Sequence, residues 1–432
     1  MMNKKLLLLF FVILTTSNVD GQIYIDIDST SGRALPIAIV PLKMLDDTPK
    51  DLFEQFPAIL ARDLNMTGLF NILSPNSFLE PSEAGITTSD TDFYLWKKTG
   101  ADALIKGGVK KQGDNYILEI RLFDVQLQES ILGKRYYFYG ENYLKAIHTF
   151  SDQIIKKLTG QPGVFASTQI LCVGNVEKFK EIFRMSVNGD DLTRITHYQS
   201  ITVSPDWSRD GNLIAYTSYI GGNPDLYIFD RQKKREKKIS SRRGLNYGAA
   251  FSPIEDVLAV AVSNDDDQEI VLMNYKGKII KTVTKNWWID IEPSWSPDGK
   301  SLAFVSNQSG KPHIYRFDLE TKNLRRLTYL GFHNVSPAWS PKGDKIAFAG
   351  KDKGLFDIFI MNTDGTNIQR LTKYGGNNEA PSWAPNGQMI VYSSDRTGKK
   401  QLYVMGGDGR GQTQITDGVG QYDTPSWSPI ME

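Results

Sequence analysis

Six aromatic residues at a constant spacing of 44 positions constrain this 432-residue chain more than any other feature. The sequence Trp-Ser-Pro-Asp-Gly, or a variant of it, surrounds most of them, and five of the eight tryptophans lie on this register. The six positions are Trp207, Phe251, Trp295, Trp339, Trp383 and Trp427. Because chance does not supply such a spacing, this part of the chain must use one structural unit repeatedly.

Each repeat unit also contains short runs of β-branched and aromatic residues. Asp-Gly, Asn-Gly and Lys-Gly pairs, which suit tight turns, separate these runs. Four strands in a unit of about 40–45 residues are typical of a β-propeller blade, whereas helical repeats would show apolar residues at 3.6-residue spacing. Six periods fill residues 168–432, so we expect an all-β six-bladed propeller there.

The last repeat stops just after Trp427, before its second strand. The run Gln169–Val173 lies 44 residues before the second strand of the following unit, so we predict that it completes the last blade. This closure removes an unpaired sheet edge. The aromatic residues that end each inner strand, termed the anchors, are expected to pack between blades, and truncating a buried one should cost roughly 3–5 kcal/mol.

The chain before the repeats is predicted to be a signal peptide followed by a mixed α/β domain. Lys4 and Lys5 precede nine apolar residues, about half the length that crosses a bilayer, which favours a cleavable secretory signal over residues 1–21. Residues 22–160 alternate strand-like and helix-like patterns, so we expect a sheet covered by helices.

Helices are expected over residues 49–70, 92–98 and 143–158, and strands over 34–42, 103–109, 116–123 and 131–138. Gly160–Gly163 is the expected linker to the propeller, where few contacts need to cross.

Composition and missing motifs exclude several classes of function. A net charge of +1 gives no electrostatic case for a nucleic-acid binder. The single cysteine, Cys172, excludes a disulfide framework and a cysteine-rich metal site, and its apolar neighbours predict burial. No nucleophile elbow, zinc-protease motif or phosphate loop occurs, so we expect no enzyme, no cofactor and no metal. No later apolar run is long enough for membrane insertion.

The loops that lead into the inner strands are the candidate binding site, because in a propeller they form one mouth of the central channel. Loops on a rigid scaffold commonly carry function, so we expect them to bind a loop of a partner or an ion. The alternative is turn-forming Asn and Asp without a partner. The candidate residues are Asn246, Tyr247, Asp290, Glu292, His333, Asn334, Asn378, Glu379, Tyr422 and Asp423.

Two charged runs favour a solvated turn over a ligand site. Six of the eight residues Arg231–Lys238 are basic and lie between two strand runs. The acidic run Asp265–Asp267, with Glu269 close behind, resembles a calcium loop only loosely.

The signal peptide, the α/β domain and the Trp-Ser-Pro-Asp-Gly propeller together resemble the TolB family of the bacterial Tol-Pal cell-envelope system. The sharper match is near the N-terminus. It consists of Ile23–Ser29 followed by Gly32-Arg33 and Pro36–Pro41, and of Leu60–Leu64 followed by Gly68–Phe70.

This resemblance implies a periplasmic, monomeric, non-enzymatic adaptor. Its propeller mouth would bind Pal, the peptidoglycan-associated lipoprotein, and its N-terminal arm would contact TolA, with Pal controlling whether the arm is free. The implied role is support of outer-membrane constriction during cell division and of envelope integrity. By position the arm is residues 22–29, and alternating isoleucines suit a strand added to a partner's sheet. Its candidate contact residues are Ile23, Tyr24, Ile25, Asp26, Ile27 and Asp28.

Two alternatives remain open at this point. A propeller peptidase would need a hydrolase domain, yet fewer than 150 residues lie outside the propeller and the signal, and no nucleophile elbow occurs. A different periplasmic propeller would bind a peptide, a glycan or a cation in its channel. Asp290, Glu292, Glu379 and Asp423 could then collect a calcium ion.

Overall fold

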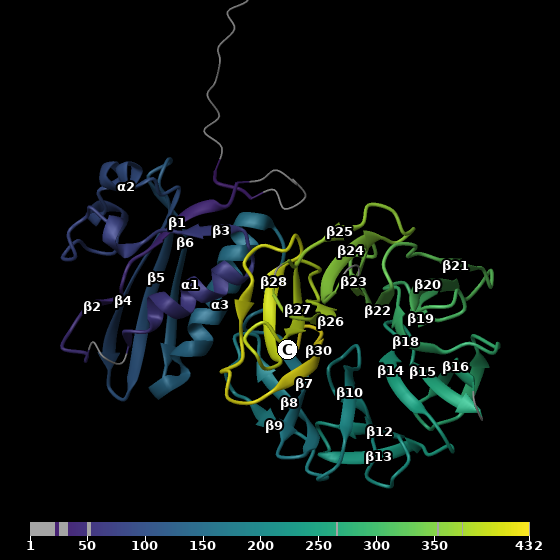
Figure 1. Cartoon of the computed structure of the whole chain (residues 1–432). Helices are drawn as coiled ribbons and strands as arrows, with labels where there is room; N and C mark the ends of the chain where they lie inside the picture. The colour runs from purple at the N-terminus through teal and green to yellow at the C-terminus, as the bar shows by residue number, and fades with distance from the viewer. Residues whose placement is uncertain are drawn as a thin grey trace, which may run out of the picture.

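The computed structural model describes residues 22–25, 33–49, 53–264, 267–351, 354–373 and 375–431, so the predicted signal peptide over residues 1–21 lies outside it. An α/β unit is followed by a ring of six four-stranded sheets (Figure 1). The predicted fold class, an α/β domain followed by a six-bladed propeller, is confirmed.

The α/β unit is built on a mixed sheet in which β1 lies parallel between β3 and β4, and β5 and β6 continue the sheet antiparallel. Its strands are β1 (Leu35–Ile39), β2 (Lys43–Met44), β3 (Phe70–Ile72), β4 (Ala103–Gln112), β5 (Asn115–Asp124) and β6 (Glu129–Phe138). Its helices are α1 (Phe56–Met66), α2 (Phe93–Thr99) and α3 (Tyr143–Thr159), with 3₁₀ turns at Pro75–Ser77, Thr88–Asp90 and Gly140–Asn142.

Helix α1 is shorter than the helix predicted over residues 49–70. Proline stands in its first turn, where a missing N–H costs nothing. At its other end the chain turns at Gly68, whose φ of +71° places it against Arg410 of the propeller. The end of α1 is therefore set by a tertiary contact, which helical periodicity alone does not contain.

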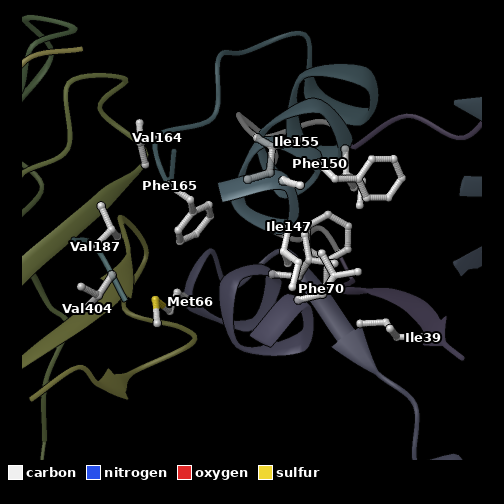
Figure 2. Close-up of a cluster of buried hydrophobic side chains, with 14 of the residues drawn as sticks. Ile39, Met66, Phe70, Ile147, Phe150, Ile155, Val164, Phe165, Val187 and Val404 are labelled. Carbon is white, nitrogen blue, oxygen red and sulfur yellow. The ribbon is translucent and has the colours of Figure 1, made fainter. Parts of the chain in front are cut away.

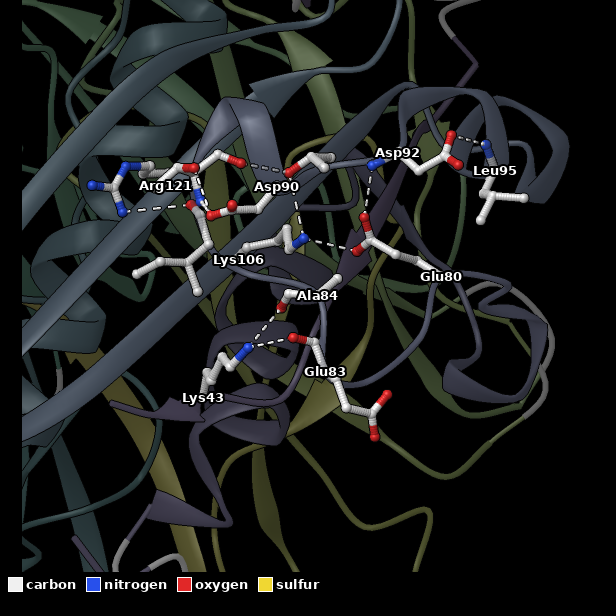
Figure 3. Close-up of polar contacts among 12 residues, drawn as sticks. Lys43, Glu80, Glu83, Ala84, Asp90, Asp92, Leu95, Lys106 and Arg121 are labelled. Carbon is white, nitrogen blue, oxygen red and sulfur yellow. Dashed lines mark hydrogen bonds and ion pairs between the residues drawn. The ribbon is translucent and has the colours of Figure 1, made fainter. Parts of the chain in front are cut away.

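A segment between β3 and α2, residues 73–92, packs with α2 on one face of the sheet, and α1 and α3 pack on the other. Figure 3 shows its polar contacts with the sheet. Lys106 Nζ lies 2.8 Å from Glu80 Oε2, and both side chains are only 3% exposed. Arg121 and Lys43 donate to backbone carbonyls of the same segment. Removing one partner of such a buried pair typically costs about 3–5 kcal/mol, because the other charge stays buried. These contacts fix the segment on the sheet.

One apolar cluster joins the α/β unit to the propeller. Phe150 packs on the side of the sheet, while Met66 lies near Val187 and Val404 of the propeller (Figure 2). All of them belong to the same set of buried side chains. The prediction that few contacts cross Gly160–Gly163 is therefore wrong, because the apolar faces of α1 and α3 are too wide for one sheet to cover.

A chain of buried polar groups crosses the same boundary. Asp63 Oδ2 accepts a hydrogen bond from Ser151 Oγ at 2.7 Å and lies 2.7 Å from His148 Nδ1. His148 Nε2 in turn lies 3.2 Å from Nδ2 of Asn188 in the propeller. Burial lowers the pKa of His148 and the contact with Asp63 raises it, with a net rise. His148 of α3 thus bridges the two units.

In each blade, the four strands of the sheet are ordered from the channel outward. The inner strands are β10 (Thr202–Trp207), β14 (Asn246–Phe251), β18 (Asp290–Trp295), β22 (His333–Trp339), β26 (Asn378–Trp383) and β30 (Tyr422–Trp427). The second strands are β7 (Gln169–Val176), β11 (Leu213–Ser218), β15 (Val257–Asn264), β19 (Ser301–Ser306), β23 (Lys345–Lys351) and β27 (Met389–Ser394). The third strands are β8 (Phe179–Ser186), β12 (Asp225–Asp230), β16 (Asp267–Asn274), β20 (His313–Asp318), β24 (Phe356–Asn362) and β28 (Gln401–Gly406). The outer strands are β9 (Thr193–Arg194), β13 (Arg235–Ser240), β17 (Ile279–Thr282), β21 (Leu324–Arg326), β25 (Gln369–Arg370) and β29 (Thr413–Gln414).

The ring closes as predicted. Strand β30 pairs antiparallel with β7, which places Trp427 opposite Ile170 and Tyr422 opposite Gly174. The sixth blade is therefore made from both ends of the repeat region. Cys172 in β7 is fully buried, and burial raises the pKa of its thiol, as expected of a packing residue.

Every inner strand carries the same backbone irregularity. Midway along it, one residue has a φ between 47° and 62°, and the pairing register with the second strand shifts there. These residues are Ser204, Gly248, Glu292, Ser336, Ala380 and Thr424. A positive φ and a bulge bend the strand, so the six inner strands curve in the same way around the channel.

Hydrogen bonds link the anchors of neighbouring blades. Ser294 Oγ accepts the backbone N–H of Trp339, and Ser382 Oγ accepts that of Trp427, both at 3.0 Å. The indole N–H of Trp383 donates to Ala338 O at 3.0 Å. The predicted packing role is confirmed for five anchors, Trp207, Phe251, Trp339, Trp383 and Trp427, which are less than 10% exposed. The sixth, Trp295, is only partly buried and packs at the side of an apolar cluster.

A glycine in the outer turn of blade 2 sets the distance to blade 1. Gly277 has a φ of +85°, and a Cβ atom there would lie 1.8 Å from the carbonyl oxygen of Ile239. Gly398 has a similar φ of +91°, yet nothing lies within 4 Å of its Cβ position. An alanine at either position would have the same left-handed backbone strain, but only at Gly277 would its Cβ atom also meet the neighbouring blade.

We therefore expect Gly277→Ala to destabilise the protein more than Gly398→Ala. Gly398→Ala should cost about 1–2 kcal/mol of left-handed backbone strain, and Gly277→Ala about 1–3 kcal/mol more, because a backbone carbonyl must move. Urea-induced unfolding followed by tryptophan fluorescence measures both. Equal losses would show that this contact does not limit how closely the two blades pack.

Candidate functional site

The six inner strands surround a central channel. A cavity of about 500 Å³ lies along their second halves, and another of about 590 Å³ opens where the inner strands begin, an end termed the loop mouth. The two cavities share the lining residues Tyr247, Ser336, Ala380 and Thr424, so the channel is continuous.

Four of the ten candidate residues line this channel: Tyr247, Glu292, Glu379 and Asp423. Lysines pair with two of the three carboxylates. Lys400 Nζ lies 2.8 Å from Glu379 Oε2, and Lys180 Nζ lies 3.3 Å from Asp423 Oδ2. The mouth is therefore polar and close to electrically balanced.

Glu292 is the ionisable residue among the six positive-φ positions in the channel wall. Its Oε2 accepts the backbone N–H of Ser336 in the next blade at 2.7 Å. Burial, and to a smaller extent the charge of Glu379, raises the pKa of the Glu292 carboxyl. Its carboxylate thus serves a contact between blades as well as facing the channel.

Five other candidates are buried in the blades, and their side chains are occupied within the chain. Asn378 Nδ2 donates to Gly375 O and Gly376 O at 3.1 and 3.3 Å, and Asn246 Nδ2 donates to Arg242 O at 2.8 Å. Asp290 accepts from Asn286, and burial raises the pKa of its carboxyl. The five residues are Asn246, Asp290, Asn334, Asn378 and Tyr422. These contacts shape the mouth loops, in agreement with the alternative that these residues form turns. A direct contact between these residues and a partner stays a prediction.

His333 is exposed at the mouth, with its ring centroid 6.5 Å from that of Phe356. The suggested calcium ligands do not come together, because Asp290 is buried in the wall of the blade and not in the channel. Across the described ranges, no group of three His, Cys, Asp or Glu residues could hold a metal ion.

An exposed aromatic surface that the 44-residue period does not predict lies beside the loop mouth. The loops before β18 and β22 expose large apolar side chains, with Trp287 at 87% and Leu330 at 77% exposure. This surface, termed the apolar ridge, consists of Trp287, Trp288, Tyr329, Leu330 and Phe332. Exposed apolar side chains that gather in one region of a protein surface often mark a binding site.

The polar β19–β20 turn contacts both loops of the ridge. On one side, the backbone N–H of Ile289, beside Trp288, donates to Asn307 Oδ1 at 2.9 Å. On the other, Lys311 Nζ lies 4.2 Å from the ring centroid of Phe332. A signal was present in the sequence: Trp287 and Trp288 are adjacent and lie off the 44-residue register, so their role cannot be that of the anchors.

The described part of the N-terminal arm is docked on the α/β unit. The backbone N–H of Ile25 donates to Leu158 O at 2.7 Å, and that of Ile23 donates to a carboxylate oxygen of β5. Both isoleucines pack against the core, while Tyr24 is 64% exposed and donates its hydroxyl to Thr159 O at 3.1 Å. The other candidate arm residues, Asp26, Ile27 and Asp28, lie outside the described residues.

Of the helices that the structure describes, none has the length and apolar character to cross a membrane.

Two family profiles together match most of the chain. The profile described as the TolB beta propeller domain matches residues 155–431, and that of the TolB amino-terminal domain matches residues 23–131.

Relatives and solved structures agree with these profiles. The chain is 35% identical over 291 residues to the Tol-Pal system protein TolB of Desulfosudis oleivorans, covering 66% of each chain. It is 34% identical to the protein TolB homolog of Chlorobium chlorochromatii, over 66% of this chain and 63% of the relative. The match thus spans just under two thirds of these two relatives.

Among solved structures, TolB from Acinetobacter baumannii superposes with a TM-score of 0.80 at 28% identity. That superposition covers 92% of this chain and 97% of the other.

The channel wall contains an acidic residue with a displaced pKa. Asp206 precedes the anchor Trp207, and its carboxylate accepts the backbone N–H of Phe251 at 2.9 Å and the hydroxyl of Ser426 at 3.1 Å. Burial raises its pKa to about 6. Ser294 and Ser382 make the equivalent bond to the next anchor without a charge.

We therefore expect Asp206→Ser to change how stability depends on pH. Because the folded pKa lies above the unfolded one, the contribution of Asp206 is fully present below pH 4 and is lost as the pH rises through 6. By pH 8 the wild type should lose up to about 3 kcal/mol that the serine variant keeps. Urea unfolding at pH 4.5 and pH 8 measures this. Parallel pH profiles of the two proteins would contradict it.

Proposed function

The chain belongs to the TolB family, and on this premise we propose that it is the periplasmic adaptor of a Tol-Pal system. In this proposal it is exported by its signal peptide, binds Pal through the loop mouth and TolA through the N-terminal arm, and has no catalytic role. Its part is then to support outer-membrane constriction and envelope integrity during division.

The observation that carries the proposal is the apolar ridge beside a polar channel mouth. Protein interfaces combine a few aromatic side chains that become buried on binding with a polar rim, and most of the binding energy comes from these few side chains. Trp287 and Leu330 have the exposure of such interface residues, and the pairs Lys400–Glu379 and Lys180–Asp423 supply polar groups at the loop mouth. Pal would therefore cover the ridge and present hydrogen-bonding groups to the mouth.

The arm supports the second half of the proposal. Its two described isoleucines face inward and Tyr24 faces outward, an alternation that a partner's sheet edge could also accept. Two backbone bonds and one hydroxyl bond hold it in place. At about 0.5–1.5 kcal/mol for each bond, such an arm can exchange between the docked position and a partner.

The first test is a binding titration with the soluble domain of the Pal-like lipoprotein from the same cell. The variant Trp287→Ser/Leu330→Ser should bind at least about 30-fold more weakly than wild type, because even one hot-spot side chain contributes 2 kcal/mol or more. Isothermal titration calorimetry measures the change.

The matched control is Ile280→Ser/Leu324→Ser, which removes two exposed apolar side chains from the outer strands β17 and β21. It should bind like wild type. Unchanged binding by the ridge variant would move the site away from the ridge. If folded wild-type protein does not bind, Pal is not its partner. The alternative is then a propeller that binds a peptide or a glycan in its channel.

The second test concerns the arm. Tyr24→Phe removes the bond to Thr159 O, so we expect faster hydrogen exchange at the Ile25 amide and about two- to fivefold tighter binding to the periplasmic domain of TolA. Tyr139→Phe, an exposed tyrosine 65% accessible, is the control and should change neither. Faster exchange with unchanged TolA affinity would show that docking and TolA binding do not compete.

A further inference from the structure

Strand β13 on the flank of blade 1 differs from the other outer strands of the propeller. It has six residues, Arg235–Ser240, whereas the other five outer strands have between two and four. It is the last strand of its sheet, so one of its edges carries unpaired backbone groups at the periphery of the ring (Figure 1). Proteins often prevent the exposed edges of two sheets from pairing by keeping the edge strands short. Strand β13 is not short and therefore lacks this protection.

The hairpin that contains β13 carries more positive charge than its carboxylates neutralise. Lys233 pairs with Asp230 and Lys238 pairs with Asp225, each at 2.9 Å. Glu236 is exposed, and its Oε2 accepts the hydroxyl of Tyr216 at 3.0 Å. All three carboxylates of the hairpin are thus engaged.

Four cations of the hairpin lie outside these two pairs. Arg231 is partly buried and donates to Gly211 O and Gln169 Oε1, which leaves Lys234, Arg235 and Lys237. They are exposed, and within the described ranges none of them forms an ion pair. On an extended strand, Arg235 and Lys237 lie on the same face because side chains alternate. They form a cationic pair along the open edge.

Blade 2 extends this charge. Its outer turn lies against β13 at the contact between Gly277 and Ile239, and the two residues that flank Gly277, Lys276 and Lys278, are both exposed. In a chain of net charge +1, five exposed cations along one strand and the adjoining turn form a local concentration of charge. Lysines at an edge can simply prevent aggregation, but that function does not call for a longer edge or a second cationic turn beside it.

We propose that β13 is a docking surface distinct from the loop mouth and the arm, and that it binds an extended acidic segment of a partner protein as a fifth strand of blade 1. The backbone of the segment would pair with the free edge of β13. Alternating Asp or Glu side chains would meet Arg235 and Lys237, with Lys276 and Lys278 at the end of the strand. Strand addition of this kind takes affinity from main-chain bonds and specificity from alternate side chains.

The test uses the mature protein and a fluorescent probe, an acetylated octapeptide of alternating Asp and Val. Fluorescence anisotropy at low salt should show binding that weakens about five- to tenfold in Arg235→Gln/Lys237→Gln. The matched control, Lys156→Gln/Lys157→Gln, removes two exposed lysines from the last turn of α3 and should bind like wild type. The same peptide with alternate backbone nitrogens methylated keeps its charges and should not bind.

Each other outcome overturns the proposal. Equal weakening in the control variant would mean that the peptide responds to net charge alone. Equal binding of the methylated peptide would exclude strand addition. If the peptide does not bind, and phosphatidylglycerol vesicles bind wild type but not the β13 variant, the surface recognises anionic lipid. Because Pal and TolA are absent from all of these mixtures, the result is independent of the proposed function.

Discussion

The pairing of β30 with β7 is the interaction on which the rest of the molecule depends. It joins residues at the two ends of the repeat region, so it is the pairing that closes the ring. Around the ring, the bonds between anchors then fix each blade to the next, and the positive-φ residues give all six inner strands one curvature. The channel wall is therefore a rigid consequence of closure.

The second organising feature is the apolar boundary between the two units. Helix α3 packs against the propeller through the shared core, and its last turn accepts two of the three hydrogen bonds that hold the arm. The chain Asp63–His148–Asn188 crosses the same boundary with buried polar contacts. One helix thus contacts the propeller on one side and the arm on the other, which places both proposed binding elements on a single packed body.

The surfaces left over from this packing divide by chemistry. The loop mouth is polar and its charges are paired, the apolar ridge is aromatic, and the β13 edge is cationic. None of these three repeats around the ring, although the blades do. A specific partner can recognise this asymmetry. Six identical mouth loops would instead let the partner bind in six equivalent orientations.

The sequence alone determined the number of blades, the strand runs of each repeat, the closing strand and the anchors. It could do so because the same residue types pack in the same way in every repeat. The sequence could not separate the buried from the exposed mouth residues. Asn378 and Glu379 are neighbours in the chain, yet strand alternation and the bulge bury one and place the other in the channel. The sequence also could not show that Lys180 and Lys400 would neutralise the mouth, nor that α1 would end against Arg410. Those outcomes depend on contacts between residues distant in the chain, which form only when the ring has closed and the α/β unit has packed against it.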